Sequence, residues 1–581
     1  MNVSTMNIFD RIEIVAAIDF GTTYSGYAYS YAHAKKTIHL NGAWANNAFK
    51  TPTIILFDAN QNFKAFGRHA EKFICDNPEY DGYYFQRFKM KLNNEKISRE
   101  MILRSEDGKE MKALQVFSEA IRYFKDHFLD SINKRCPSNM VDVAQVRWVL
   151  TVPAIWSHAS KQFMREAGEK AGIPKINLSI ALEPECASIY CQHKDVADFQ
   201  TTIKNEPGTK YLVLDNGGGT VDASVHQILQ NGKLRSLHMP SGGAWGGSNV
   251  NEGFEKYLES IFSSAVIQKV KTLHPDHWLK MRREFEDIKT SLDECVQNFY
   301  SMSLANAFIK IYKEETHNDI DQRITYLNDS RGFYFNCSGG AHIQGGETLK
   351  IPRGVITDLI KEMSTKIKRH TEKLLKNEEI RGLDFVNMVG GFSNSSIVRD
   401  DIQSLISDIH WPEYSELAVL RGAVIAGWNP DLISSRRSLQ TYGIQTNRDF
   451  VKEKHPERLK YKNKDGVWKC GSIFDTLVTV NEEVDVGQVG KVSKTYHPLL
   501  RNQNKVTFPI YTSSKNKVSY CDEEGCRKVG KITVDSPNVE KGINRDIKVD
   551  IIFGNTEFFV DVLDVSSANR RHATFDFLST Q

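Results

Sequence analysis

The sequence predicts a large α/β domain with an internal duplication, followed by a smaller β-rich, sandwich-like domain. Two observations predict the α/β domain. A buried strand that ends in a glycine turn occurs twice, and long segments with helical periodicity accompany the two copies. A third observation, a change to short alternating strands after residue 428, predicts the second domain. We expect the two domains to span residues 1–432 and 433–581.

The first copy of the strand and turn is "EIVAAIDFGTTYSGYAYSYA", residues 13–32. Its apolar run predicts a buried strand, and the aromatic and small residues that follow suit a second strand, so Gly21 marks a hairpin turn. The second copy is "KYLVLDNGGGTVDASVHQIL", residues 210–229, where three glycines separate an apolar run from an alternating segment. The arrangement therefore indicates a weak internal duplication.

Two long helices are predicted from apolar residues that recur every three or four positions. The apolar positions of the first are Leu114, Phe117, Ile121, Phe124, Phe128 and Ile132. Those of the second are Val355, Leu359, Met363 and Ile367. We interpret both stripes as core faces without chemistry of their own.

The C-terminal region is predicted to be mostly β. "VTFPIYTSS", "KVGKITVDS" and "DIKVDIIFGNTEFFVDVLDV" have the alternation of half-buried strands. In the last segment Gly554 and Asn555 form a turn, which predicts an antiparallel hairpin. No long amphipathic helical pattern follows, so a helical lid over this domain is not expected.

Composition argues against several classes of partner. Lys plus Arg number 75 and Asp plus Glu 72, a formal charge of +3 that provides no bulk attraction to nucleic acid or acidic lipid. We therefore expect no clear nucleic-acid or membrane site. Nine scattered cysteines lack zinc-site spacing and fit a reducing compartment. The first residues lack the basic start and apolar core of a signal peptide, which predicts a cytoplasmic protein.

The glycine turns indicate phosphate binding. Backbone amides freed by glycine approach a phosphate closely, whereas a flanking carboxylate repels it unless a divalent cation lies between them. Asp19, Asp215 and Asp222 therefore suit a hydrated Mg²⁺, and Thr22, Thr23 and Thr220 offer hydroxyls to phosphate oxygens. A single such motif could be an ordinary tight turn, but two copies can hold one phosphate chain from opposite sides. Neither copy is a P-loop or a dinucleotide fingerprint, because no GxxxxGK[ST] occurs and a strand follows the glycines.

Together these motifs resemble the ATPase domain of the 70-kilodalton heat-shock protein family, within the actin-like superfamily with its duplicated ribonuclease H-like fold. "AIDFGTTYSG" and "LDNGGGTVDAS" resemble the two phosphate segments of the family. "TVPAIWSHASKQFMREAGEKAGI" and "LEPECASIY" resemble its first connecting region, "VNMVGGFSNSSIVRD" its adenosine segment and "ELAVLRGAVIAGW" its second connecting segment. The order is that of the family from about Ile14 to about Trp428, and the lidless tail resembles a divergent subgroup.

The resemblance implies a site for ATP or ADP with Mg²⁺. It assigns the metal to Asp19 and Asp222 and the catalytic roles to Glu183, Asp215, Thr220 and Lys89. It assigns nucleotide contacts to Gly21, Thr22, Thr23, Gly217, Gly218, Gly219, Glu286, Lys289, Gly390 and Gly391. Without the resemblance, Glu286 and Lys289 would be read as part of a solvated helix face.

The sequence departs from the family pattern in three places. In "YYFQRFKMKL" the lysine that contacts phosphate is taken as Lys89, with Arg87 and Lys91 as alternatives. Thr290 stands where the family has a basic residue that stacks on adenine, and "FSNSS" has no basic counterpart either. The apolar interdomain linker of the family is replaced by "NPDLISSRRS", which predicts weak coupling between the domains.

The resemblance implies a slow, Mg²⁺-dependent ATPase with chaperone-like function, whose partners are unfolded or client polypeptides. One alternative is a nucleotide sensor or scaffold that does not hydrolyse ATP, because phosphate binding requires fewer residues than in-line attack by water. Another is a small-molecule kinase of the actin-like superfamily, for which we find no substrate-positioning base.

Overall fold

The computed structural model describes most of the chain. It covers residues 12–42, 44, 48–93, 96–135, 137–138, 140–193, 204–292, 297–329, 340–463, 466–487, 491–554 and 558–578. The N-terminal residues that bear on a signal peptide, and Asn555 of the predicted hairpin turn, lie outside this part. Within it, no helix has the length and apolar character needed to cross a membrane.

The chain divides into two compact units. The first comprises residues 1–204, 211–223 and 241–428, and the second comprises residues 205–210, 224–240 and 429–581. The second unit therefore includes two short segments that lie far upstream of its main part. The domain division near Leu432 remains a prediction about which parts fold independently.

One mixed sheet of the first unit contains the first glycine turn. Its strands are β1 (Ile14–Phe20), β2 (Tyr24–Tyr31), β3 (His39–Leu40), β4 (Thr51–Pro52), β10 (Val146–Val152) and β11 (Leu178–Leu182). Their order is β11-β10-β1-β2-β3, with β4 also paired to β2. Strands β1 and β2 form the expected antiparallel hairpin, and β10 and β11 continue the sheet in parallel.

A second sheet contains the second glycine turn. Its strands in or entering the first unit are β12 (Lys210–Asn216), β13 (Val221–Ile228), β15 (Ser241–Gly243), β19 (Phe385–Val389) and β20 (Ile409–His410). The order β20-β19-β12-β13 repeats that of β11-β10-β1-β2, again with two parallel pairs beside a hairpin. The internal duplication predicted from the sequence is thus present in the strand order.

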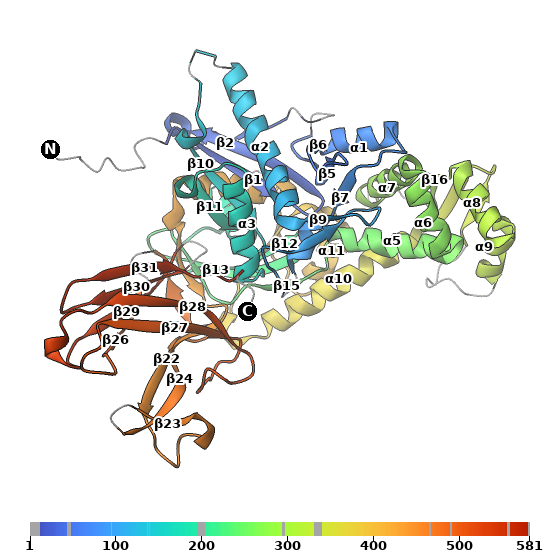
Figure 1. Cartoon of the computed structure of the whole chain (residues 1–581). Coiled ribbons are helices and arrows are strands. Elements are labelled where there is room, and N and C mark those ends of the chain that lie inside the picture. The colour runs from blue at the N-terminus through green and yellow to red at the C-terminus, as the bar shows by residue number, and fades with distance from the viewer. Residues whose placement is uncertain are drawn as a thin grey trace. The chain divides into compact units, whose positions relative to one another are not determined.

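Twelve α-helices accompany the sheets in the part of the chain that the structure describes (Figure 1). They are α1 (Arg68–Asp76), α2 (Ala113–Arg135), α3 (His158–Lys170), α4 (Glu183–Gln192), α5 (Gly247–Phe262), α6 (Ser264–Leu273), α7 (Pro275–Thr290), α8 (Asn306–Thr316), α9 (Ile320–Asp329), α10 (Arg353–Leu375), α11 (Ser396–Gln403) and α12 (Ala418–Trp428). Helices α2 and α10 bury the two apolar stripes predicted from the sequence, except for Leu114, which is partly exposed.

Helices α4 and α12 pack against each other especially closely. A Cβ atom on Gly422 of α12 would lie 1.8 Å from the carbonyl oxygen of Cys186 on α4, so only glycine permits this approach. Helix α4 begins at Glu183 and α12 follows the short 3₁₀ turn η9 (Ser415–Leu417). Both helices therefore hold segments that contribute side chains to the site.

Three smaller sheets complete the first unit. Their strands are β5 (Ile54–Phe57), β6 (Phe63–Phe66) and β7 (Tyr83–Gln86); β8 (Ile102–Arg104) and β9 (Glu110–Lys112); and β16 (Phe299–Ser303), β17 (His342–Gln344) and β18 (Thr348–Pro352). Two further 3₁₀ segments, η4 (Phe88–Asn93) and η8 (Gly391–Asn394), carry residues of the site.

The second unit is rich in β-structure. Its strands after residue 428 are β21 (Ile433–Arg437), β22 (Thr441–Asp449), β23 (Lys460–Lys462), β24 (Trp468–Val478), β25 (Glu483–Asp485), β26 (Lys491–Tyr496), β27 (Lys505–Ser513), β28 (Cys526–Asp535), β29 (Ile547–Phe553), β30 (Phe558–Asp564) and β31 (Arg570–Thr574). Apart from β21 and β25, these strands form a five-stranded sheet, β23-β24-β22-β27-β28, and a four-stranded sheet, β26-β29-β30-β31.

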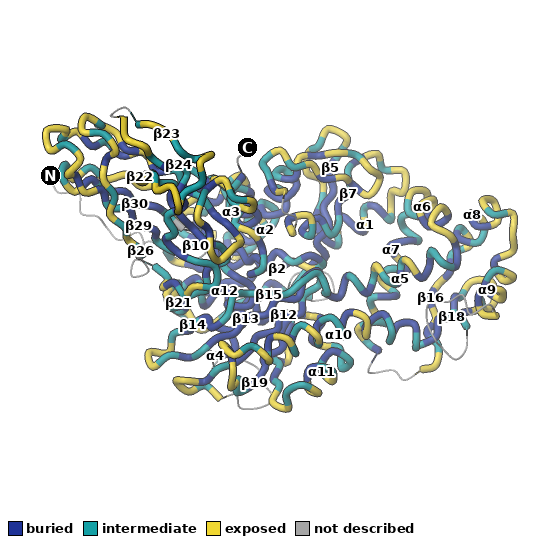
Figure 2. The backbone as a smooth tube through the Cα atoms, turned by 90° about the horizontal axis from the view of Figure 1, so that it is seen from below, coloured by how far each residue is buried: buried dark blue, intermediate teal, exposed yellow. Residues whose placement is uncertain are grey.

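The two sheets of the second unit share one hydrophobic core. Ile444 and Ile510 of the five-stranded sheet belong to the same buried cluster as Val549 and Val562 of the four-stranded sheet. The buried positions along β22, β29 and β30 can be followed in Figure 2. The predicted hairpin is confirmed, because β29 pairs with β30 in antiparallel register from Ile547 to Phe553.

The segment "NPDLISSRRS" differs from the polar linker expected from the sequence. Residues 433–437 form strand β21, which pairs in parallel with β14 (Leu234–Ser236) and antiparallel with β25. Ile433 and Ser435 are buried, whereas Arg436 and Arg437 are partly exposed. The arginines therefore belong to a strand in which buried and exposed positions alternate. The polar composition of the segment does not predict such a strand.

Candidate functional site

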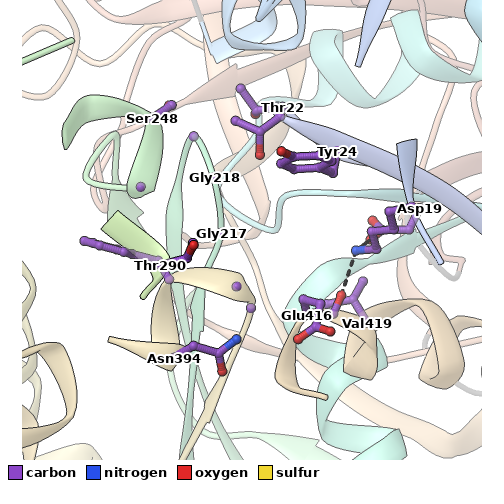
Figure 3. A pocket seen from close by; sticks show the side chains of 18 of the residues that line it. Asp19, Thr22, Tyr24, Gly217, Gly218, Ser248, Thr290, Asn394, Glu416 and Val419 are labelled. Carbon is purple, nitrogen blue, oxygen red and sulfur yellow. Dashed lines mark hydrogen bonds and ion pairs between the residues drawn. The ribbon is translucent and has the colours of Figure 1, made fainter. Parts of the chain in front are cut away.

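A cavity of about 540 Å³ lies within the first unit, and both glycine turns line it (Figure 3). The structure brings every predicted catalytic and nucleotide-contacting residue to this cavity. They are Gly21, Thr22, Thr23, Lys89, Glu183, Asp215, Gly217, Gly218, Gly219, Thr220, Glu286, Lys289, Gly390 and Gly391. Of the two predicted metal residues, Asp19 lines the cavity and Asp222 does not.

The first turn connects β1 to β2 through residues 21–23. Thr53 holds this turn, since its Oγ1 donates to the carbonyl oxygen of Gly21 at 2.8 Å and its backbone N–H donates to that of Thr23 at 2.8 Å. A Cβ atom on Gly21 would lie 2.1 Å from the carbonyl oxygen of Tyr24. Glycine is therefore required by the tightness of the turn.

The second turn is held by the start of α5. The carbonyl oxygens of Gly217, Gly218 and Gly219 accept hydrogen bonds from the backbone N–H groups of Gly247, Ser248 and Gly246, at 3.1, 2.7 and 3.2 Å. With their carbonyls directed at this helix, the glycines have a defined orientation. The helix N-terminus also adds a positive partial charge on this side of the cavity.

The two turns face each other. A Cβ atom on Gly218 would lie 2.3 Å from Oγ1 of Thr23, and one on Gly219 would lie 2.5 Å from Oγ1 of Thr22. Among the residues that the structure describes, the backbone N–H groups of Thr22, Thr23, Gly218 and Gly219 have no hydrogen-bond partner. Backbone donors left open beside a cavity are a typical cradle for phosphate oxygens.

Four buried carboxyl groups surround this cradle. Asp19, Glu183, Asp215 and Asp222 are at most 9% exposed. Burial, together with Asp19 and Asp222, raises the pKa of Glu183 to about 7 despite its pairing with Lys89. Burial and the neighbouring acids Glu183, Asp222 and Asp19 raise the pKa of Asp215 well above its ordinary range. Buried acids with raised pKa values in a cavity are typical of functional sites.

Two lysines offset part of this negative charge. The Nζ atom of Lys89, on η4, lies 2.7 Å from Oε1 of Glu183. The Nζ atom of Lys50 lies 2.5 Å from Oδ2 of Asp19. Burial opposes the charge of Asp19, but the Lys50 ammonium outweighs it and lowers the pKa of Asp19. Among the three basic candidates considered from the sequence, Lys89 lines the cavity, while Arg87 and Lys91 do not.

Asp222 lies behind the cavity wall. Its Oδ1 accepts a hydrogen bond from the backbone N–H of Ile155 at 3.0 Å. Burial raises the pKa of Asp222, although this hydrogen bond and one from Thr220 favour the charged form. Asp222 therefore stands where it orients Thr220 and adds negative charge beside Glu183 and Asp215.

Helix α7 and the start of α5 form a different part of the cavity. The Lys289 ammonium donates to Oε2 of Glu286 at 2.8 Å, to Oδ1 of Asn251 at 2.9 Å and to the carbonyl oxygen of Gly247 at 3.2 Å. These bonds use all three ammonium hydrogens. Lys289 therefore positions Glu286 and the start of α5.

Gly390 and Gly391 follow β19 and adopt a sharp turn. Gly390 has a φ of +82°, and a Cβ atom there would lie 2.5 Å from the carbonyl oxygen of Asn216. A Cβ atom on Gly391 would have its nearest contact at 3.8 Å, with Cβ of Glu416. Gly390 is thus required by the backbone, whereas Gly391 leaves open space in the cavity wall.

The sequence interpretation missed several residues that line the cavity. Lys50 and Tyr24 belong to the β2–β4 region, and Phe392, Tyr414 and Glu416 lie beside the Gly390 turn. Tyr24 and Phe392 lie within motifs quoted from the sequence, and Glu416 begins another, so their position beside the site was available as a signal. Lys50 has no such signal, because it precedes a short strand that only the pairing of β4 with β2 brings to the site.

The residues present fit a polyphosphate with a divalent cation. Four carboxyl groups lie near only two ammonium groups, and burial, together with the neighbouring acids, raises the pKa values of Glu183 and Asp215. A hard divalent cation prefers carboxylate oxygens and water. The open N–H groups of the two turns supply donors for phosphate oxygens. Asp19 and Asp215 would hold the cation through its water shell, with Asp222 supporting them.

The protein-family model described as Hsp70 protein matches residues 15–321. Heat shock 70 kDa protein 12A of Mus musculus is 31% identical over 631 residues, which cover 97% of this chain and 92% of that protein. Heat shock 70 kDa protein 12B of Homo sapiens is 31% identical over 638 residues, covering 97% and 91%. Chaperone protein DnaK of Mycoplasmopsis synoviae (strain 53) is 22% identical over 442 residues, covering 75% and 62%.

Proposed function

The chain belongs to the Hsp70 protein family, and we propose that it binds ATP and ADP with Mg²⁺ in this cavity and hydrolyses ATP slowly. In this proposal the nucleotide state controls the binding of unfolded polypeptides by a β-rich domain, residues 433–581, which follows the nucleotide-binding domain, residues 1–432. Membership of the family supports a nucleotide-binding, chaperone-like protein.

The observation that carries the proposal is the pair of facing glycine turns. Their unpaired backbone N–H groups, on Thr22, Thr23, Gly218 and Gly219, line one cavity. Each turn belongs to one of two sheets with the same strand order. A phosphate chain between them would receive donors from both halves, which neither turn provides alone.

Glu183 and Asp215 are the groups best suited to orient an attacking water. Both are buried, and their raised pKa values mean that each holds a proton more readily than an exposed acid. When bound, Mg²⁺ would neutralise phosphate charge and favour ionised carboxylates in this site. Glu183 would then accept a hydrogen bond from the water, with Oε1 held by Lys89.

Thr220 and Lys89 would act on the phosphate side. Thr220 lines the cavity at the end of the second turn, and Asp222 orients its hydroxyl. Lys89 is 3% exposed and is aligned by Glu183. A buried ammonium next to a phosphate stabilises the charge that develops on its oxygens during transfer.

A nucleotide sensor that does not hydrolyse ATP is the second candidate. The position of Asp222 favours it, because this carboxylate is engaged by Ile155 and Thr220 and does not line the cavity. In that case nucleotide binding would persist without turnover. The actin-superfamily kinase receives no support from a particular observation.

We further propose a reducing compartment, the cytoplasm. The six cysteines that the structure describes are all free thiols: Cys75, Cys186, Cys191, Cys470, Cys521 and Cys526. Buried unpaired thiols are common in reducing compartments and unusual in secreted proteins.

The proposal is tested by calorimetry and by measuring phosphate release from purified protein. Binding of ADP that requires Mg²⁺, together with slow phosphate release, is expected. Binding without phosphate release would favour the sensor, and no binding of either nucleotide would exclude both candidates. Addition of an unfolded peptide tests the chaperone-like part. Its labelled form, followed by fluorescence anisotropy, is expected to dissociate at rates that differ between ADP and ATP.

A further inference from the structure

Lys50 is a partly buried cation of the cavity to which no role has been assigned. It immediately precedes β4, whose residues Thr51 and Pro52 pair with Ser25 and Tyr24 of β2. Its side chain is 15% exposed and lines the cavity. Removing an ammonium from water costs several kcal/mol unless partners compensate it, so the surroundings of Lys50 should explain its position.

The ammonium of Lys50 joins two segments that are 366 residues apart. It donates to Oδ2 of Asp19 at 2.5 Å and to the backbone carbonyl oxygen of Glu416 at 2.7 Å. Asp19 and Glu416 therefore lie on the same side of the cavity, as Figure 3 shows. The remaining Lys50 N–H has no partner among the residues that the structure describes.

Asp19 is held from both sides by this arrangement. Its Oδ1 accepts from Oγ1 of Thr151 at 2.7 Å, while Oδ2 is bound by Lys50. The carboxylate plane is therefore set by two donors, one from β10 and one from the residue before β4. Water in the shell of a bound cation would find both oxygens in defined positions.

Glu416 is linked in turn to the Gly390 turn. The backbone N–H of Gly390 donates to the carbonyl oxygen of Ser415 at 2.9 Å, and Oγ of Ser415 donates to the carbonyl oxygen of Gly390 at 3.0 Å. A Cβ atom on Gly391 would lie 3.8 Å from Cβ of Glu416. Lys50 thereby connects the carboxylate beside the phosphate cradle to the turn on the nucleoside side.

We propose that Lys50 is a positioning residue that couples the two ends of the nucleotide site, holding Asp19 for the metal-bound phosphates and the Glu416 main chain for the nucleoside. This inference rests on the proposed binding of Mg²⁺ nucleotide. Lys50 differs in this from Lys89, whose ammonium pairs with Glu183. Loss of Lys50 would leave Asp19 without its cation and Glu416 without its donor.

The test compares ADP affinity with Mg²⁺ and with EDTA by titration calorimetry of the full-length chain. The variants are Lys50→Met, which keeps the stem and removes the charge, and Lys50→Arg, which keeps charge and donors. Lys112→Met is the matched control, because Lys112 pairs with Glu100 at 2.9 Å on the exposed surface. Thermal unfolding of each variant verifies folding, and Lys50→Arg maintains the test if Lys50→Met does not fold.

We expect Lys50→Met to weaken ADP binding in Mg²⁺ at least about tenfold and in EDTA at most about threefold. Lys50→Arg should bind ADP in Mg²⁺ at least about threefold more tightly than Lys50→Met does. In an Asp19→Asn background, Lys50→Met should change affinity in Mg²⁺ by less than about threefold, because the part of its effect that acts through Asp19 is already lost and only the contact with Glu416 remains. A structural role alone would weaken binding equally with Mg²⁺, with EDTA and in both backgrounds.

Two outcomes overturn the inference separately from the proposed function. If the wild-type chain binds ADP with Mg²⁺ and Lys50→Met binds equally well, Lys50 has no positioning role. Equal losses in the wild-type and Asp19→Asn backgrounds would also exclude it, because the two residues would then act independently. If the wild-type chain does not bind ADP, the proposed function fails and this inference fails with it.

Discussion

The two ends of the cavity, one proposed to bind the phosphates (the phosphate end) and one the nucleoside (the nucleoside end), differ in charge and in packing. The phosphate end contains Asp19, Glu183 and Asp215 with the buried Lys89 and the partly buried Lys50. At the nucleoside end, the charges of Glu286 and Lys289 satisfy each other through a direct ion pair. A Cβ atom would collide with the opposite turn at Gly218, whereas at Gly391 it would have open space.

This difference indicates where binding energy is concentrated. Buried charges with open donors give strong, directional contacts to a charged ligand, because the dielectric constant is low there. At the nucleoside end, a preformed ion pair, Thr290 and Asn394 line the cavity. These groups can contribute only shape complementarity and modest hydrogen bonds to the binding of a nucleobase. The phosphates should therefore dominate affinity and turnover, with the base contributing least.

The largest effect is expected from charge placed in the phosphate cradle. A Cβ atom on Gly217 has its nearest contact at 3.1 Å, with the carbonyl oxygen of Thr220, so this glycine tolerates substitution better than Gly218. Gly217→Glu should weaken ADP binding about a thousandfold, or roughly 4 kcal/mol, by adding like charge beside the phosphates. Calorimetry measures the change, and Gly217→Ala is the control. Nearly unchanged affinity in Gly217→Glu would show that the phosphates bind elsewhere.

A pH dependence of stability is expected from the same end. The pKa of Glu183 is raised from 4.5 to about 7 by burial and neighbouring acids. Between these values the folded chain binds more protons than the unfolded chain, so the free energy of unfolding falls as pH rises. Without nucleotide or metal, the ionisation of Glu183 should lower the free energy of unfolding by about 2 kcal/mol between pH 5.5 and pH 8.

Denaturant unfolding at the two pH values tests this expectation. Glu183→Gln should flatten the slope relative to the wild type, whatever its effect on absolute stability. Glu314→Gln, at an exposed position on α8, should leave the slope unchanged. Parallel slopes for wild type and Glu183→Gln would mean that Glu183 ionises normally.

A smaller effect is expected on turnover. Glu183→Gln should reduce ATP hydrolysis at least about tenfold, or roughly 1.4 kcal/mol, while ADP affinity changes less than about threefold. The reason is that an oriented water matters in the transition state more than in the bound state. Single-turnover phosphate release measures the rate, with Glu314→Gln as the control. An unchanged rate would assign hydrolysis to other groups.

The smallest effect is expected at the nucleoside end. Thr290 lines the cavity and its hydroxyl donates only to main-chain carbonyls of α7. Thr290→Arg should tighten ADP binding about threefold, because a guanidinium plane stacks on a base. Inorganic tripolyphosphate, which has no base, should bind this variant about as well as the wild type. Tighter binding of both ligands would indicate a general charge effect instead of stacking.

Much of the site could be predicted from the sequence because its parts are local. The turn at Gly21 and the glycines at 217–219 each follow an apolar run within a few residues. Their chemistry follows from residue type, and the strands β1, β2, β12 and β13 form where the pattern predicts. The position of Lys50 could not be predicted, since its partners Asp19 and Glu416 come from distant segments.

The sequence by itself determined the duplicated strand-and-turn pattern, the helical stripes of α2 and α10 and the β-rich character of the C-terminal region. These features depend on side chains within one turn or one strand repeat. The tertiary structure alone decided that β21 joins a sheet with β14, and that Asp222 lies behind the cavity wall. It also decided that Lys50 bridges Asp19 and Glu416. Such contacts depend on which strands pair and on which distant segments of the chain meet. No local pattern of residues indicates them.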